Sequence, residues 1–201
     1  MNPSDGSQQL TLLYSRAQIR KRVTELAKAI ADDYPGRQLV VVCVLNGAVV
    51  FLADLLRAFQ QDVRLGFVSV SSYGASAESS GAPAIQIPSD LPLAGKDVLI
   101  VEDILDTGLS MTLLCQAIQA RLPASLRICV LIDKQQRRLH EVQPDYVGFE
   151  LLSGFVVGYG MDYAEKYRSL PDIFSVDVEE PVCQSDRTLT LVSRSLLRND
   201  L

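Results

Sequence analysis

Apolar positions recur along the chain at two spacings, and the change from one to the other separates predicted helices from strands. Within residues 14–33, apolar side chains recur at intervals of four, three and four between arginines and lysines, at Ile19, Val23, Leu26 and Ile30. This spacing predicts an amphipathic helix. The segment that follows, QLVVVCVL at 38–45, is a continuous run rich in β-branched residues. Such a run is typical of a strand that is covered on both faces.

The remaining predicted elements alternate in the same way. Strands are predicted at 63–73, 97–103, 126–133 and 145–151, and helices at 48–60 and from Ser110 onward. Asn46-Gly47 forms the turn after the first strand, and the Gly/Ser/Ala segment 74–84 is predicted to be a mobile loop. The alternation predicts an α/β fold with a Rossmann-like, mostly parallel central sheet and helices on both faces.

Composition favours one compact domain, or one core with a small appendage, and argues against two kinds of partner. Its 201 residues are 48% hydrophobic, which suits one core of α/β size. The net charge of −5 gives no general attraction to a nucleic acid backbone, so no nucleic acid partner is expected, although Arg137 and Arg138 could form a local basic patch. The longest apolar run, 39–56, is interrupted by Asn46, Gly47 and Asp54. A membrane span needs about 20 predominantly apolar residues, so no membrane contact is expected.

The cysteines and the single histidine indicate no redox or metal chemistry. Cys43, Cys115, Cys129 and Cys183 have no C-x-x-C spacing, and three lie in apolar runs. We therefore expect free thiols in a reducing cytosol. The first ten residues lack the features of a signal peptide, which agrees with a cytoplasmic location. His140 has no ligand-like partner nearby and is expected to be structural or solvent-facing.

Three carboxylates stand near one predicted strand end, beside residues suited to hold an anion. In VLIVEDILDTGLSMT (98–112), four apolar residues precede Glu102 and Asp103, and Asp106 begins the loop 106–110. Ligands of parallel sheets bind at the carboxyl ends of strands, and N–H groups that open a helix hold phosphates. An adjacent acidic pair can bind two vicinal hydroxyls or a hydrated Mg²⁺. A ribose 5-phosphate meets both demands and leaves Asp106 near the ring for acid–base work.

The segment VLIVEDILDTGLS resembles the phosphoribosyl-pyrophosphate motif of the type I phosphoribosyltransferases. Four further segments resemble the hypoxanthine-guanine phosphoribosyltransferases, in the same order: LNGAVVF at 45–51, SSYGASAESSG at 71–81, LIDKQQRR at 131–138 and FVVGYGMDYAEKYRSLPDI at 155–173. The resemblance implies the type I fold, with a small hood subdomain beside the central sheet. It also implies purine salvage: Mg²⁺-dependent transfer of the 5-phosphoribosyl group from phosphoribosyl pyrophosphate to N9 of hypoxanthine or guanine, giving IMP or GMP.

The resemblance further implies a role for individual residues of the ribose and purine sites. Asp106 would be the general base that takes the proton from purine N7. The ribose 5-phosphate would be bound by Glu102, Asp103, Asp106, Thr107, Gly108, Leu109 and Ser110. The first two of these would also hold Mg²⁺. The purine site would be formed by Lys134, Phe155, Val156 and Asp162. In that site, Lys134 would donate to the 6-oxo group, Phe155 would stack on the base, and Val156 would offer backbone groups.

Pyrophosphate binding, lid closure and assembly are implied in the same way. The loop Leu45–Asn46–Gly47, in which relatives often have a cis peptide bond, would bind pyrophosphate together with Arg168. Asp162 would hold a second Mg²⁺. Ser72 and Tyr73 belong to a loop that would close as a lid and exclude water. Relatives are usually dimers or tetramers, so a homodimer or homotetramer is implied.

The resemblance divides the chain into a flexible N-terminus (1–11), a single phosphoribosyltransferase domain (12–181) and a C-terminal extension (182–201). The hood would come from the N-terminal part and from 150–180.

Three positions depart from the pattern of relatives. Leu109 replaces a lysine of several relatives but still supplies a backbone N–H. Asn46 replaces a lysine or arginine, which would weaken pyrophosphate binding. Gly66 stands where many relatives have aspartate, and the sequence assigns no consequence to it.

Alternative interpretations remain for the function and for single residues. Receiver domains also carry an acidic pair after a strand, but near their start, whereas about a hundred residues precede it here. A non-catalytic regulator that senses phosphoribosyl pyrophosphate is disfavoured, because Asp106, Lys134 and Asp162 are all present. A preference for another 6-oxopurine such as xanthine stays open. Lys134 could instead be solvated, and Phe155 and Tyr159 could pack in the core.

Overall fold

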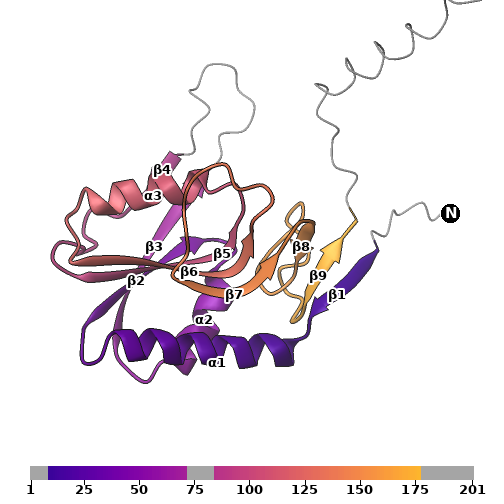
Figure 1. Ribbon diagram of the computed structural model, residues 1–201, viewed down its shortest axis with the longest axis horizontal. Coiled ribbons are helices and arrows are strands. Elements are labelled where there is room, and N and C mark those ends of the chain that lie inside the picture. The colour runs from indigo at the N-terminus through magenta and orange to yellow at the C-terminus, as the bar shows by residue number, and fades with distance from the viewer. Residues whose placement is uncertain (1–8, 72–83, 178–201) are drawn as a thin grey trace, which may run out of the picture.

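A six-stranded sheet forms the centre of the computed structural model, which describes residues 9–71 and 84–177 (Figure 1). Its spatial order is β4 (Ala84–Gln86), β3 (Val63–Ser71), β2 (Leu39–Leu45), β5 (Asp97–Leu105), β6 (Ser125–Lys134) and β7 (Tyr146–Leu151). All neighbouring strands are parallel except β4, which pairs with β3 in the antiparallel direction. The predicted mostly parallel sheet is therefore confirmed.

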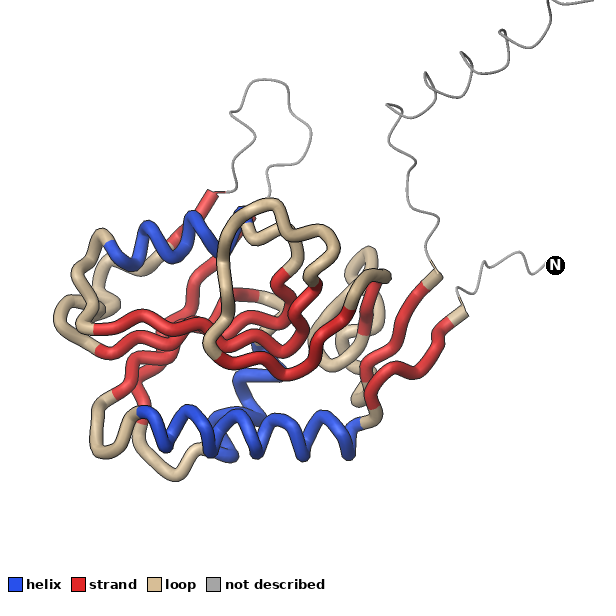
Figure 2. The backbone as a smooth tube through the Cα atoms, in the orientation of Figure 1, coloured by secondary structure: helices blue, strands red, loops and turns tan. Residues whose placement is uncertain are grey.

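Helices cover both faces of this sheet, as the sequence predicts. α1 (Arg16–Asp33) and α2 (Val49–Ala58) lie on one face and α3 (Leu109–Gln119) lies on the other (Figures 1 and 2). The run at 39–45 is apolar throughout because β2 contributes to two cores. Val41 and Cys43 belong to the cluster under α1 and α2, whereas Val40, Val42 and Val44 belong to the cluster under α3.

The direction in which successive strands are added to the sheet reverses between β2 and β5. From β2 the chain passes through α2 to β3 on one side, and from β5 it passes through α3 to β6 on the other. α2 and α3 therefore leave from neighbouring strands and cover opposite faces. In open α/β sheets, the crevice at such a reversal, outside the carboxyl ends of the strands, is the usual ligand site.

A second, three-stranded antiparallel sheet stands beside the central one and corresponds to the predicted hood. It consists of β1 (Leu10–Tyr14), β9 (Ile173–Val176) and β8 (Phe155–Val157), in that order. Leu10 and Thr11 fall inside the predicted flexible N-terminus but lie in β1, because Leu10 pairs with Val176 and Thr11 with Ser175. Partners so distant along the chain leave no local signal. The exact domain limits remain predictions.

Element boundaries otherwise lie close to the predicted ones, and the main shift has a local cause. α1 begins at Arg16 rather than at residue 14, because Ser15 caps it. The Ser15 side chain accepts a hydrogen bond from the Gln18 N–H, and the Gln18 side chain accepts one from the Ser15 N–H at 2.9 Å. This reciprocal capping box satisfies two N–H groups of the helix start. The last two residues of the predicted strand 63–73 lie outside the described residues.

Gly66, which differs from the aspartate of many relatives, makes room for a core side chain. A Cβ at this position would overlap the side chain of Leu91. Leu91 is buried in the apolar cluster under α3, together with Leu93 and Val68. A larger residue at 66 would therefore displace Leu91. Within the described residues, no helix is long and apolar enough to cross a membrane.

A cluster at the end of α1, remote from the sheet's carboxyl edge, predicts a pH-dependent contribution to stability. Asp33 pairs with Arg127 and accepts a hydrogen bond from the Tyr146 hydroxyl at 2.6 Å. The hydrogen bond from Tyr146, and then that from Arg127, lowers the pKa of Asp33 below its ordinary value of 3.8. A lowered pKa in the folded state stabilises the protein above the ordinary pKa, and this stabilisation is lost as the pH falls.

We therefore expect Asp33→Asn to lower the melting temperature at pH 7 and to have progressively less effect below about pH 4. Asp32→Asn is the matched control, because Asp32 pairs with Lys28 on the helix surface and both side chains are exposed. It should change the melting temperature little at either pH. Thermal unfolding followed by circular dichroism measures both variants. An Asp33→Asn effect that is the same at pH 7 and pH 3 would contradict the assignment.

Candidate active site

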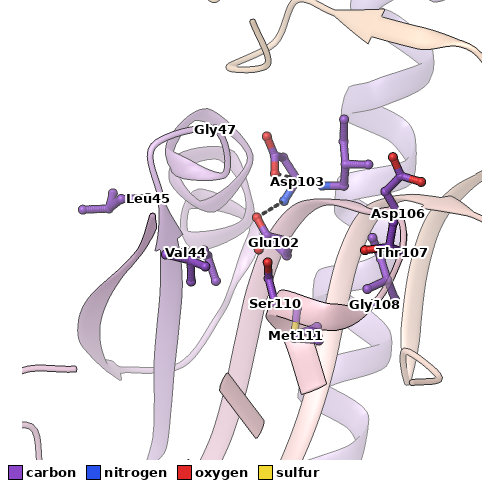
Figure 3. A pocket seen from close by; sticks show the side chains of 13 residues that line it. Val44, Leu45, Gly47, Glu102, Asp103, Asp106, Thr107, Gly108, Ser110 and Met111 are labelled. Carbon is purple, nitrogen blue, oxygen red and sulfur yellow. Dashed lines mark hydrogen bonds between the residues drawn. The ribbon is translucent and has the colours of Figure 1, made fainter. Parts of the chain in front are cut away.

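A cavity of about 250 Å³ lies at the carboxyl ends of β2 and β5, where the strand order reverses (Figure 3). It is lined by residues of the end of β2 and the loop after it, of β3, of the end of β5 and of the loop and first turn of α3, namely Val44, Leu45, Gly47, Val70, Glu102, Asp103, Ile104, Leu105, Asp106, Thr107, Gly108, Ser110 and Met111. The structure thus brings most of the predicted ribose 5-phosphate residues together with one of the predicted pyrophosphate residues, Gly47.

Glu102 and Asp103 form a half-buried acidic pair in this cavity. The Asp103 N–H donates to Glu102 Oε1 at 3.1 Å, and the Ile104 N–H donates to Asp103 Oδ1 at 2.9 Å. Burial, and then the charge of Asp103, raises the pKa of Glu102 well above its ordinary value. Two carboxylates at one strand end are therefore a site of excess negative charge, which a cation or hydroxyl donors would relieve.

The loop after β2 approaches this pair so closely that only glycine fits. A Cβ on Gly47 would overlap the Asp103 carboxylate. The peptide bond Leu45–Asn46 is cis, as the resemblance to relatives implies. A second glycine supports the loop from behind, because a Cβ on Gly160 would overlap the carbonyl oxygen of Gly47. Sequence reasoning gave Gly160 no role, since its contact lies more than a hundred residues away along the chain.

The helices that start beside the cavity have no side-chain cap. α3 begins after Gly108, whose φ of 86° is the left-handed conformation that glycine adopts readily, and α2 begins after Ala48. Neither start has a side-chain hydrogen bond or an acidic residue in its first turn. The remote α1, by contrast, has a full capping box. Uncapped N–H groups and the helix dipole favour an anion at both starts.

Asp106 presents a carboxylate oxygen that has no partner within the described part of the chain. Its Oδ1 atom is buried without a hydrogen bond, while Oδ2 lies 3.9 Å from Arg137 Nη1. A buried polar oxygen without a hydrogen bond is costly, so such an atom at a cavity is expected to meet a donor on a ligand. The side chain lies beside Thr107 and Gly108, in the loop that leads into α3 (Figure 3).

Lys134 and Phe155 meet where β6 ends and β8 begins. The Lys134 ammonium lies 5.8 Å from the centre of the Phe155 ring, and Lys134 is only 7% exposed. It is therefore not a solvated lysine. Phe155 is 40% exposed and packs edge-on against Tyr163, so it is not a core residue, whereas Tyr159 is buried and donates a hydrogen bond to Asp54 at 2.7 Å. The Val156 side chain is buried, and its strand β8 is the edge of the small sheet.

Arg168 and Asp162 lie together on the loop between β8 and β9. Arg168 Nη2 is 2.7 Å from Asp162 Oδ1, and Arg168 Nη1 donates to the Gly160 carbonyl at 3.0 Å. The other Asp162 oxygen accepts the Glu165 N–H at 2.9 Å. Because Gly160 packs against Gly47, these contacts connect Arg168 to the loop after β2.

The donor set suits a cation that keeps much of its own coordination shell. Among the described residues, no three His, Cys, Asp or Glu side chains converge on one metal position, so Asp162 does not join Glu102 and Asp103 in a common group. The acidic pair offers only oxygen atoms. Mg²⁺ prefers oxygen ligands and commonly keeps several waters and substrate oxygens beside one or two carboxylates. The pair therefore fits Mg²⁺ better than a metal that needs a complete protein cage.

Two further sequence predictions concern the lid residues and the basic run that contains Arg138. Ser72 and Tyr73, the predicted lid residues, lie outside the described residues. Arg138 belonged to a run interpreted as a possible basic surface patch, yet its side chain is 18% exposed and pairs with the buried Asp133. Its other contacts are with backbone carbonyls, which sequence does not reveal.

Comparison with known proteins agrees with this geometry. A family model described as "Phosphoribosyl transferase domain" matches residues 11–164. A hypoxanthine-guanine phosphoribosyltransferase of Aquifex aeolicus (strain VF5) is 44% identical over 169 residues, which cover 84% of this chain and 95% of the relative.

Two solved structures are similar over most of the chain. A crystal structure of a hypoxanthine-guanine phosphoribosyltransferase from Bacillus anthracis has a TM-score of 0.76 and 42% identity, and covers 83% of this chain and 97% of the other. A hypoxanthine phosphoribosyltransferase from Trypanosoma cruzi, in a ternary substrates complex, has a TM-score of 0.77 and 41% identity, with 84% and 95% covered.

The repulsion within the acidic pair predicts that the site costs stability when it holds no cation. Glu102→Gln removes one charge while keeping the shape, so its melting temperature without divalent cations should exceed that of the unaltered protein. Addition of Mg²⁺ should stabilise the unaltered protein more than the variant, because a ligand of the native state stabilises it. Glu141→Gln on an exposed loop is the control and should show neither effect. Equal Mg²⁺ stabilisation of both proteins would argue against a cation on the pair.

Proposed function

The chain belongs to the hypoxanthine-guanine phosphoribosyltransferases of the phosphoribosyl transferase family, and we propose that it transfers a 5-phosphoribosyl group from phosphoribosyl pyrophosphate to N9 of hypoxanthine or guanine, with Mg²⁺. It is thus a transferase that serves purine salvage. The observation that carries the detailed proposal is the meeting, in one cavity, of the acidic pair Glu102–Asp103 and the uncapped start of α3. A ribose 5-phosphate carries hydroxyls for the first and a phosphate for the second.

The phosphate and ribose are assigned to residues 102–110. The N–H groups of 106–110 and the hydroxyls of Thr107 and Ser110 donate to the 5′-phosphate, and Gly108 lets the backbone approach it. Leu109, which replaces a lysine of several relatives, contributes only its N–H. Glu102 and Asp103 accept hydrogen bonds from the ribose hydroxyls.

Asp106 is assigned as the general base. As N9 attacks the anomeric carbon and pyrophosphate leaves, the purine loses the proton on N7. The Oδ1 atom of Asp106 is supported as its acceptor because it is buried beside the cavity without a hydrogen bond. A base in this position holds the proton while the new bond forms.

Base recognition is assigned to the contact between β6 and β8. Lys134 donates to the 6-oxo group, which would favour hypoxanthine and guanine over adenine, whose 6-amino group is itself a donor. Phe155 stacks on the ring with its exposed face, and the edge strand gives Val156 backbone groups for the rest of the base. A preference for xanthine is the alternative within the same reaction.

Pyrophosphate is assigned to Asn46, Gly47 and Arg168. The uncapped start of α2 follows this loop and favours an anion there. Arg168 is held by Asp162 and by the Gly160 carbonyl and contributes the positive charge that Asn46 lacks. Asp162 is also assigned as a ligand of a second Mg²⁺. The ion pair between Asp162 and Arg168 would have to rearrange for this ion to bind.

Glu102 and Asp103 would hold Mg²⁺, as their all-oxygen donor set fits it. When bound, the ion neutralises negative charge on the pyrophosphate leaving group. The loop that contains Ser72 and Tyr73 is assigned as a lid over the site, which would protect the cation-like ribosyl centre from water.

Assembly and location belong to the same proposal. Leu65 and Phe67, two residues apart on β3, present exposed apolar side chains on one face of the sheet, which supports a homodimer or homotetramer. A reducing, cytoplasmic location is supported by free Cys43, Cys115 and Cys129.

The deciding experiment is a turnover assay with phosphoribosyl pyrophosphate, Mg²⁺ and one base at a time. Nucleotide formed from hypoxanthine or guanine but not from adenine supports the proposal, and the ratio of rates gives the preference. A higher rate of product formation with xanthine than with hypoxanthine or guanine would make xanthine the preferred substrate. Binding of phosphoribosyl pyrophosphate without product from any base would contradict the enzyme and favour a regulator.

Asp106→Asn keeps the shape of the side chain and removes the base. Turnover should fall by roughly 10²- to 10⁴-fold, the usual contribution of acid–base catalysis. The affinity for nucleotide product should change far less. Steady-state kinetics and a product-binding titration measure the two quantities, and unchanged turnover would remove Asp106 from this role.

Lys134→Ala should raise the dissociation constant of the purine by about 10- to 100-fold, because a hydrogen bond from a charged donor is lost. Mg²⁺-dependent binding of phosphoribosyl pyrophosphate should stay intact. Lys96→Ala is the matched control, since the Lys96 ammonium donates a hydrogen bond to Gln38 at the surface. Purine affinity that is the same in both variants would refute the role of Lys134.

A further inference from the structure

The loop that begins α3 is held from behind by residues 138–140. The Arg138 side chain donates from Nε to the Asp106 carbonyl at 2.9 Å and from Nη2 to the Leu105 carbonyl at 3.3 Å. The N–H groups of Leu139 and His140 both donate to the Thr107 carbonyl, at 3.0 and 3.1 Å. Three consecutive carbonyls of the loop are therefore bound by one short segment.

These contacts fix the direction of the loop's N–H groups. In a planar trans peptide, the carbonyl of one residue and the N–H of the next point in opposite directions. The carbonyls of 105, 106 and 107 point to the segment 138–140, so the N–H groups of 106, 107 and 108 point away from it. Those residues line the cavity of the active site, whereas Arg138 lines a different cavity behind the loop. The N–H groups thus face the position assigned to the phosphate.

The same guanidinium also reaches the strand that carries the purine-selecting lysine. Arg138 Nη2 donates to the Lys134 carbonyl at 3.3 Å and pairs with Asp133, and Nη1 donates to the Val142 carbonyl at 2.5 Å. The aliphatic part of the Arg138 side chain lies against the loop that begins α3, because a Cβ on Gly108 would come within 3.1 Å of Arg138 Cδ. One partly buried side chain therefore joins the end of β5, the start of α3 and the end of β6.

We propose that Arg138 is a positioning residue that orients the 5′-phosphate cradle and fixes it relative to Lys134. This inference rests on the proposed function, because the cradle is assigned to a phosphate there. Arginine suits the task, since its planar fork has five donors in fixed directions, whereas lysine has one compact ammonium. Asp133 is the charged partner of Arg138 within residues 9–71 and 84–177, and most of the guanidinium donors are left for carbonyls.

The test compares a ligand that has the phosphate with one that lacks it. GMP and guanosine share base and ribose, so the ratio of their dissociation constants isolates the phosphate. In Arg138→Gln, the advantage of GMP over guanosine should shrink by about tenfold or more, because hydrogen bonds to a charged group are misaligned. Turnover should fall by about a hundredfold, as expected when reacting groups are displaced by an ångström. Arg138→Lys should behave like Arg138→Gln.

Two variants separate positioning from loss of stability. Arg127→Gln removes the arginine that pairs with Asp33 and Tyr146 at the other end of β6, so it should lower the melting temperature without changing the GMP-to-guanosine ratio. The double variant Asp133→Asn/Arg138→Gln leaves no unpaired buried charge and should fold, yet keep the shrunken ratio.

A normal ratio in Arg138→Gln, or recovery of the ratio in the double variant, would overturn the positioning role. The unaltered protein distinguishes this failure from failure of the proposed function. If it binds GMP no better than guanosine and forms no nucleotide, the phosphate assignment itself is wrong.

Discussion

Two helix starts whose backbone N–H groups receive no side-chain cap determine what this molecule can bind. Both lie at the crevice between β2 and β5, where the order of the sheet reverses, and both follow loops whose glycines let other groups approach closely. An uncapped start is stable only with another partner for its N–H groups. Water can serve as that partner, and the phosphates of the proposed substrate would replace it. The carbonyls on the opposite side of the α3 loop are already bound by residues 138–140, so the loop cannot readily turn its N–H groups away.

The acidic pair and the two helix starts beside it suit different parts of one ligand. Glu102 and Asp103 repel each other, and burial adds to the cost of their charges, which raises the pKa of Glu102. Phosphates cannot occupy that position, but hydroxyls and Mg²⁺ can. A phosphorylated ribose with a pyrophosphate group places negative charge at the two helix starts and its hydroxyls at the pair. In the proposed complex, positive charge from Arg168, which is linked to Gly47 through Gly160, would supplement the charge that Mg²⁺ would supply in a protein of net negative charge.

Elements with a strong local pattern could be predicted from the sequence. The helices and the parallel strands follow from periodicity, and the site at 102–110 follows from polar residues at a strand end. The small sheet was harder to predict, because β1 pairs with β9 more than a hundred residues away. The role of Gly66 depends on Leu91, and that of Gly160 on Gly47, so neither is visible locally. The sequence left a basic patch at Arg137 and Arg138 possible and did not reveal the structural role of Arg138, because its partners are mostly carbonyls, which every residue carries.

The central claim is that one nucleotide spans the cavity from the start of α3 to Lys134. A crystal structure of the protein with bound GMP tests it most directly. The account predicts phosphate oxygens at about 2.7–3.2 Å from the N–H groups of residues 107–110, guanine on Phe155, and the 6-oxo atom at a similar distance from Lys134 Nζ. A phosphate found instead in the cavity beside α1 and α2, where Arg20 and Arg57 lie, would contradict the account.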